Sequence, residues 1–378
     1  MRYVHDEVIK ERSRGVFAIH SLTAEALCTF ILDVVRSLGL DWANCVAQCY
    51  DGASVMSGWA NGVQARIKSE VPHAVYVHCY AHRLNLVVVH CKSDIREVKE
   101  FFDTVQLLCD FISNSSTRHV FFIKAQKNLN QQVLELEITA VRRWLYWYRC
   151  ISKVILRYEA ILGTLQAATE IRIGKSATEA AGLLAIIESF SFVAVLHIME
   201  KVLGITNPLS EQLQESGLVI VHAETLVSTT RATLQSARED EACSSVLQKA
   251  ASFSADVGLD SNLQAAVNQP ARSRSSRVRK LSKQLTGYLV DTTTGQQNVT
   301  ADGFVTVEQQ ITRMYFAIID RMLAEFDRRF TSNTELLHSL KAFDASSDSF
   351  VSVDSVQQLA SNYRIHIDEV MLPSQTVA

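Results

Sequence analysis

Residues 49–58 read Cys-Tyr-Asp-Gly-Ala-Ser-Val-Met-Ser-Gly, and this stretch is the most informative part of the sequence. The apolar residues before Asp51 predict a strand, and the small residues after it predict a tight turn. A carboxylate held at a strand end leaves room for a metal ion and a phosphate, as two-metal phosphoryl transfer requires. An Asp-Gly pair is also the ordinary composition of a turn or a helix cap. Both interpretations of Asp51 therefore stay open.

The segments on both sides of this stretch alternate between strand and helix patterns. Residues 15–20 and 74–78 are short apolar runs that predict strands. Residues 23–39 predict an amphipathic helix that begins at an N-cap threonine and ends at a glycine, and residues 62–69 predict a shorter helix. Such alternation is typical of a sheet covered by helices. Its parallel part would place Asp51 at the C-terminal end of a strand, where α/β sheets keep their chemistry.

After residue 79 the hydrophobic pattern is helical almost throughout, with apolar stripes along residues 95–112 and 311–326. Residues 183–203 are apolar on nearly every face, yet they include four titratable side chains, Glu188, His197, Glu200 and Lys201. Charge near the middle of this segment makes a membrane span costly. We therefore expect a buried core helix there and no membrane as a partner.

These patterns divide the chain into four parts. We expect an α/β core over residues 1–90, a helical domain over 91–251, a Ser/Arg-rich and polar linker over 252–306, and a helical segment over 307–378. Only four prolines occur in the 378 residues, which permits long helices. The predicted fold is mostly helical overall.

The composition limits the class of protein. Hydrophobic residues make up 48% of the chain and charged residues 20%, which indicates a globular protein rather than a disordered one. The net charge of −3 lacks the basic excess of a self-sufficient nucleic-acid binder, so any contact with DNA depends on local patches. Eight widely spaced cysteines and a polar N-terminus without a signal-peptide pattern predict free thiols in a reducing compartment.

A Cys-x-x-His motif, Cys79 to His82, follows the strand predicted at residues 74–78. With the nearby His78, His90 and Cys91 this motif suggests a metal-binding module, because zinc favours such ligands. A closed zinc site needs four convergent ligands, and the downstream pair of a regular zinc finger is absent from the sequence. A structural, hydrogen-bonded Cys/His pair is the simpler interpretation. One tightly bound zinc per chain, found by elemental analysis, would overturn it.

Three sequence motifs follow one another along the chain, at residues 48–54, 61–67 and 78–86. Together they resemble the ribonuclease-H-like core of hAT-superfamily transposases, and more narrowly the transposable-element-derived group of zinc finger MYM-type protein 1-like proteins. The resemblance covers residues 1–250, and 305–372 more loosely. It implies a partial ribonuclease-H-like α/β core followed by a large all-α insertion domain.

The resemblance also implies roles for individual residues. Asp51 matches a catalytic aspartate that binds Mg²⁺ in the intact family, and Cys79 and His82 match a mainly structural pair. Trp144 matches a tryptophan that stacks near the cleaved DNA end, and a buried Trp144 is the alternative. The sequence has no match for the first Asp and the last Glu of the acidic triad. We therefore expect a transposase-like fragment that is no enzyme and needs no cofactor, because one acid does not hold two metals.

Two other functions stay open. The chain is alternatively a domesticated nuclear factor that binds DNA or proteins, with homo- or hetero-oligomers formed through helical faces, or the Cys/His metal-binding module. The linker carries a basic cluster whose members suit phosphate contact or nuclear import: Arg272, Arg274, Arg277, Arg279 and Lys280. A solvated stretch is the alternative for this cluster. We expect weak, salt-sensitive DNA binding and a nuclear location, otherwise a cytoplasmic one.

Overall fold

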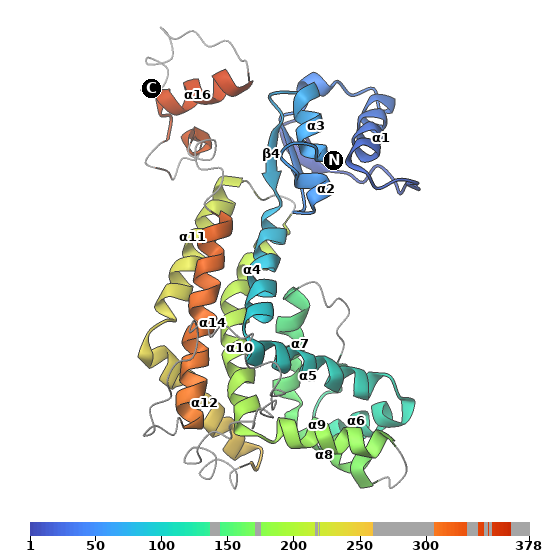
Figure 1. Cartoon of the computed structure of the whole chain (residues 1–378), viewed down its shortest axis with the longest axis vertical. Helices are drawn as coiled ribbons and strands as arrows, with labels where there is room; N and C mark the ends of the chain where they lie inside the picture. The colour runs from blue at the N-terminus through green and yellow to red at the C-terminus, as the bar shows by residue number, and fades with distance from the viewer. Residues whose placement is uncertain are drawn as a thin grey trace, which may run out of the picture.

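The computed structural model describes residues 1–136, 144–170, 175–215, 218, 220–259, 306–330, 339–343, 347 and 350–363. These residues form a small α/β unit at the N-terminus and an elongated helical body below it in Figure 1. The fold is mostly helical with small sheets, as the sequence predicts. The third predicted part, residues 252–306, lies mostly outside the described residues.

The α/β unit contains two separate two-stranded sheets. Strands β1 (Arg2–His5) and β2 (Val8–Glu11) form an antiparallel hairpin, and β3 (Ala47–Tyr50) and β4 (Val75–His78) pair in parallel. The helices of the unit are α1 (Ala24–Ser37), η1 (Trp42–Asn44), α2 (Ser54–Ser57) and α3 (Val63–Glu70). The strands predicted before Asp51 and at residues 74–78 are therefore confirmed, and the structure pairs them in parallel.

Helix α1 shows how local chemistry sets the element boundaries. The hydroxyl of Thr23 accepts a hydrogen bond from the backbone N–H of Ala26 at 3.3 Å, which satisfies one of the free donors at the helix start. Gly39 follows the helix with a φ of +67°, a conformation that favours glycine. The buried side of α1 packs Cys28 with residues of α3 in a small core of its own. The predicted helix over 23–39 is confirmed.

The strand predicted at residues 15–20 is wrong. This segment is an exposed loop, and Val16 is completely exposed. Gly15 has a φ of +129°, which interrupts an extended chain, and Phe17 instead packs edge-on against Phe30 of α1. The physical reason is that a short apolar run becomes a strand only where a neighbouring strand accepts its backbone hydrogen bonds. Within the described residues this run has no such neighbour.

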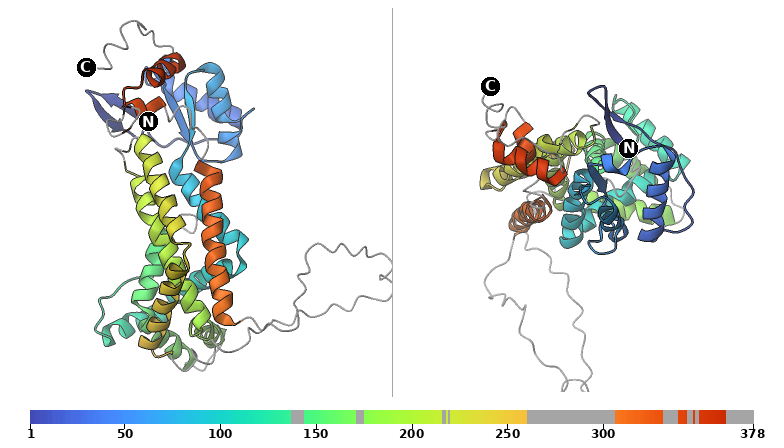
Figure 2. Two further views of the ribbon diagram at one scale, coloured as in Figure 1. Left: turned by 90° about the vertical axis from the view of Figure 1, so that its left-hand side faces the viewer. Right: turned by 90° about the horizontal axis from the view of Figure 1, so that it is seen from above.

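The helical body is built around one long central helix, α10 (Phe190–Gln212), which contacts helices on several sides. Figure 2 shows the long helices running nearly side by side along the body. The remaining helices of the body are α4 (Tyr80–Asp94), α5 (Arg96–Ser113), α6 (Ser116–Asn128), α7 (Trp144–Leu156), α8 (Tyr158–Glu170), α9 (Lys175–Ile187), α11 (Ile220–Ser236), α12 (Asp240–Asp256) and α14 (Val307–Phe330). Near the C-terminus lie η2 (Lys341–Phe343) and α16 (Val353–Tyr363).

The segment 183–203 is buried as predicted, but it is not one helix. It spans the end of α9 and most of α10, which begins after Ser189. The Ser189 hydroxyl accepts from the backbone N–H of Phe192 at 3.3 Å and so caps the new helix. By length and composition alone, α10 is one described helix that is apolar enough to cross a membrane, and 67% of its apolar window is buried inside the protein.

Helix α4 joins the two parts of the molecule. It begins directly after β4, and its buried side chains Leu84, Val87 and Val88 pack in the core of the helical body. The boundary predicted at residues 90/91 thus falls near the C-terminal end of α4, whereas the packing partners change near residue 79. Helix α14 contacts α4, α10 and α11, so residues 307–330 share the core of residues 91–251.

Candidate functional site at the strand ends

Asp51 directly follows β3, at the C-terminal end of a parallel strand. Its side chain is exposed, and its Oδ1 accepts a hydrogen bond from the backbone N–H of Ala53 at 3.2 Å. This bond stabilises the turn that leads into α2. The predicted position of Asp51 is confirmed, whereas its role as a metal ligand stays a prediction.

The turn after Asp51 lies directly against the end of β4. A Cβ atom on Gly52 would lie 2.7 Å from Cε1 and 2.9 Å from Nε2 of His78. Only glycine allows this close approach of backbone and ring. Burial, together with the positive charges of Arg83 and His82, lowers the pKa of His78 to about 4. The imidazole of His78 is therefore neutral at neutral pH.

Replacing Gly52 with Ala should lower the free energy of unfolding by about 1–3 kcal/mol, because the new methyl group displaces the His78 ring. Gly163 in α8 provides the matched control, since a Cβ atom there would meet nothing within 4 Å. Gly163→Ala should raise the unfolding free energy by about 0.5–1 kcal/mol, because alanine favours a helix interior. Urea unfolding measures both variants. Equal changes of the same sign would show that His78 is not held against this turn.

Cys79 occupies the position before the first turn of α4, where backbone N–H groups are free to bind an anion. The neighbouring Cys49 side chain and the backbone N–H groups of His82 and Ala81 lower the pKa of Cys79 to about 6. The neighbouring Cys79 side chain and burial raise the pKa of Cys49.

His82 lies on the first turn of α4, with its ring centroid 5.6 Å from that of His78. The Cys79 and His82 pair thus adjoins the junction of the last strand and α4, as predicted. Arg83, 6% exposed, donates from Nη1 to the backbone carbonyl of Arg329 at 2.9 Å. A cation at the C-terminal end of α14 is favourable, and it ties the strand ends to the helical body.

The side chains at the strand ends do not fit Mg²⁺. This ion takes oxygen ligands in octahedral geometry. Around Asp51 the neighbouring ionisable groups include the His78 imidazole and the Tyr76 hydroxyl, and two thiols lie close by. Among the described residues, no group of three or more His, Cys, Asp or Glu side chains is arranged to hold a metal ion.

The other predicted site residues are not brought to the strand ends by the described structure. Trp144 begins α7, and its side chain lies outside the described residues. The cluster of Arg272, Arg274, Arg277, Arg279 and Lys280 also lies outside them. Helix α7 buries Trp147, whose ring packs edge-on against Phe102 at 4.8 Å.

Two residues of the N-terminal unit gain a role only from the structure. Gln48 is buried, and its amide donates to the carbonyls of Gln64 and Ala74, at 3.1 and 3.5 Å. These two bonds give Gln48 a structural role, because they tie β3 to α3 and to the start of β4. Trp59 is 89% exposed in the turn between α2 and α3. In the sequence, a tryptophan among the small and polar residues of a turn could have indicated this exposed side chain.

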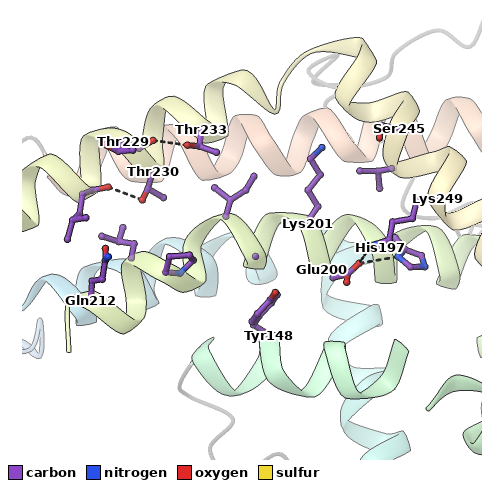
Figure 3. Close-up of a pocket in the computed structure, with 16 residues that line it drawn as sticks. Tyr148, His197, Glu200, Lys201, Gln212, Thr229, Thr230, Thr233, Ser245 and Lys249 are labelled. Atoms are coloured by element: carbon purple, nitrogen blue, oxygen red, sulfur yellow. Dashed lines mark hydrogen bonds and ion pairs between the residues drawn. The ribbon is translucent and has the colours of Figure 1, made fainter. Parts of the chain in front are cut away.

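The helical body contains a cavity of about 710 Å³ between α7, α10, α11 and α12. Figure 3 shows His197 and Lys249 both directed at Glu200, with distances of 3.2 and 2.8 Å. These bonds lower the pKa of Glu200 to about 2. Threonine hydroxyls of α11 donate to carbonyls one turn earlier in their own helix. The polar groups of this pocket thus largely bind within the protein.

The strand-end geometry lies in a segment with known relatives. Residues 1–62 match the family model described as ZMYM1/FAM200, RNase-like domain. The N-terminal segment is ZMYM1/FAM200-like. The match includes Asp51 and Gly52 in this RNase-like domain and ends before Cys79 and His82. No solved structure matches the chain.

Proposed function

We propose that this chain derives from a hAT-type transposase and that Asp51 stands at the place of one metal-binding aspartate. The observation that carries the proposal is the position of Asp51 directly after the parallel strand β3, inside the RNase-like match. Sheets with parallel strands keep reactive groups at this edge. The helical body would then be the large all-α insertion that such a transposase carries.

We further propose that the chain does not cut or join DNA by itself. Two-metal phosphoryl transfer needs several carboxylates that converge on the metals. Asp51 is exposed, and its carboxylate accepts a hydrogen bond from the backbone of its own turn. The groups beside it include imidazole and thiol rather than a second carboxylate cluster. The inferred function is therefore contact with DNA or with other proteins, in the nucleus.

Two features support contact with DNA, one from the sequence and one from the structure. The basic cluster at residues 272–280, known from the sequence alone, would bind phosphates without sequence preference and in a salt-dependent way. Trp59 offers an exposed ring, and exposed aromatic rings stack on bases of single strands. Partner proteins would bind the outer faces of the helical body, and the chain itself would be a monomer or an oligomer.

A cleavage assay tests the absence of catalysis. Purified chain, Mg²⁺ or Mn²⁺, and DNA that carries transposon ends should give no nicked or joined product. Asp51→Ala should behave as the parent does, because one carboxylate does not complete a two-metal site. Asp41→Ala is a matched control, since Asp41 is an exposed acid that caps η1 in the same unit. Metal-dependent cleavage by the parent that Asp51→Ala alone abolishes would refute the proposal.

A further inference from the structure

The cavity between α7, α10, α11 and α12 has the size and the lining of a small-molecule site. Its volume of about 710 Å³ lies within the range of ligand pockets, which are mostly apolar with a few polar groups. The apolar side chains that line it are Ile205, Pro208, Leu209, Leu226 and Val246. They give the apolar body of a ligand a place out of water, which favours binding.

The threonines of α11 that line the cavity add to its apolar surface. The hydroxyls of Thr229, Thr230 and Thr233 donate to carbonyls of their own helix, at 2.9, 2.8 and 3.0 Å. A threonine hydroxyl has one proton, so a bond to the preceding turn uses its only donor. These side chains therefore contribute methyl groups to the cavity, and they do not donate to an anion.

The charged residues that line the cavity leave one cation without a partner. Glu200 carries the negative charge of the lining, and it already binds Lys249 at 2.8 Å and His197 at 3.2 Å. Lys201 is half-buried, and it forms no ion pair within the described part of the chain. Figure 3 shows its side chain directed away from Glu200. Partial burial of an unpaired ammonium group is unfavourable, and an anion bound beside it would compensate the charge.

A glycine keeps part of the cavity open. Gly204 of α10 lines the cavity opposite Tyr148 of α7, and a Cβ atom on Gly204 would lie 3.4 Å from Cε2 of the Tyr148 ring. Glycine is a poor residue for a helix interior, since its backbone loses more freedom than that of any other residue. Its effect at this position is to leave space between α7 and α10, and a longer side chain would fill that space.

We propose that this cavity binds a small organic monoanion with an apolar body, such as a medium-chain carboxylate, and that Lys201 binds its charged group. One unpaired ammonium group compensates one negative charge, so a singly charged head group matches the lining and a phosphate dianion does not. A nucleic acid carries a charge at every phosphate and needs a row of cations, which the described lining does not offer. The site is therefore separate from the DNA-related function proposed above.

The test measures binding of octanoate to the full chain by isothermal titration calorimetry at neutral pH. Three further probes separate the parts of the ligand. Acetate keeps the charge without the apolar body, octan-1-ol keeps the body without the charge, and octylammonium carries the opposite charge. Octanoate should bind once per chain. Each of the other three should bind at least about tenfold more weakly, because a hydrogen bond to a charged group and a buried alkyl chain each contribute that factor or more.

Three variants locate the site. Lys201→Met removes the charge and keeps an apolar side chain, so it should weaken octanoate binding about tenfold or more and leave octan-1-ol binding unchanged. Gly204→Leu should abolish binding of both, because the new side chain fills the space beside Tyr148. Lys99→Met is the control, since Lys99 is an exposed lysine of α5 outside the cavity, and it should bind octanoate as the parent does. Circular dichroism and urea unfolding show that each variant is folded.

Four results would contradict the proposal. Equal octanoate affinity of Lys201→Met and the parent would remove the assigned role of Lys201. Equal affinity for octan-1-ol and octanoate would show that the cavity does not select a charge, and equal affinity for acetate would show that it does not need an apolar body. Octanoate that shows no saturable binding, or that still binds to folded Gly204→Leu, would rule out this cavity as the site.

Discussion

Replacing Glu325 with Gln should lower the free energy of unfolding by about 3 kcal/mol, because it leaves Arg328 and Arg329 without their buried counter-ion. Glu325 lies on α14 with its side chain 2% exposed. Its carboxylate binds Arg328 at 2.7 Å, Arg329 at 2.9 Å and Arg321 at 3.2 Å. Arg321 also binds Asp94 on α4, so the cluster joins two helices of the body.

Asp327→Asn is the matched control, because this substitution removes the same charge from the same helix. Its side chain is 52% exposed, and it pairs with the exposed Arg231 on α11. Asp327→Asn should cost only about 0.5 kcal/mol, since water screens an exposed pair. Urea unfolding at neutral pH compares the two. Equal losses would show that burial of the Glu325 carboxylate does not determine the effect.

The cost of Glu325→Gln should also depend on pH. Burial raises the pKa of Glu325, but hydrogen bonds from Arg328 and Arg329 outweigh it, and the pKa in the folded chain lies below the ordinary value. Such a carboxylate contributes its full stability above the pKa of the unfolded chain and loses it as pH falls through the folded pKa. The difference between parent and variant should therefore shrink in acid. A difference that grows with acidification contradicts this.

Phe102→Ala should lower the free energy of unfolding by about 3–5 kcal/mol, because it empties a fully enclosed ring site. Phe102 is 0% exposed on α5. Its ring packs edge-on against Trp147 of α7 at 4.8 Å and against its neighbour Phe101 at 5.2 Å. This contact links α5 to α7 in the middle of the helical body, so the whole body should lose stability.

Two other variants serve as comparisons for the stability loss of Phe102→Ala. Phe102→Leu keeps most of the apolar volume and should cost less than about 1.5 kcal/mol. Phe343→Ala removes an equally large ring that is 68% exposed and should change stability by less than about 0.5 kcal/mol. Denaturant unfolding followed by circular dichroism measures all three. Similar losses for Phe102→Ala and Phe343→Ala would refute the assigned core.

The sequence alone determined the elements whose signals are local. Helix α1 follows from an N-cap threonine, apolar residues at helical spacing and a final glycine, all within seventeen residues. Strand β3 and the turn at Asp51 follow from an apolar run and small residues that adjoin it. Local hydrogen bonds and side-chain periods need no distant partner, so such patterns can be read directly from the chain.

Only the tertiary structure decided which distant residues meet. Cys49 lies opposite Val77 because β3 pairs with β4, and Arg83 reaches the carbonyl of Arg329 because α14 packs on α4. The apolar run at residues 15–20 stayed a loop for the same reason, since no strand lies beside it among the described residues. Such contacts depend on closing long loops and on burying apolar surface across the whole core, and neither is encoded in a short window of sequence.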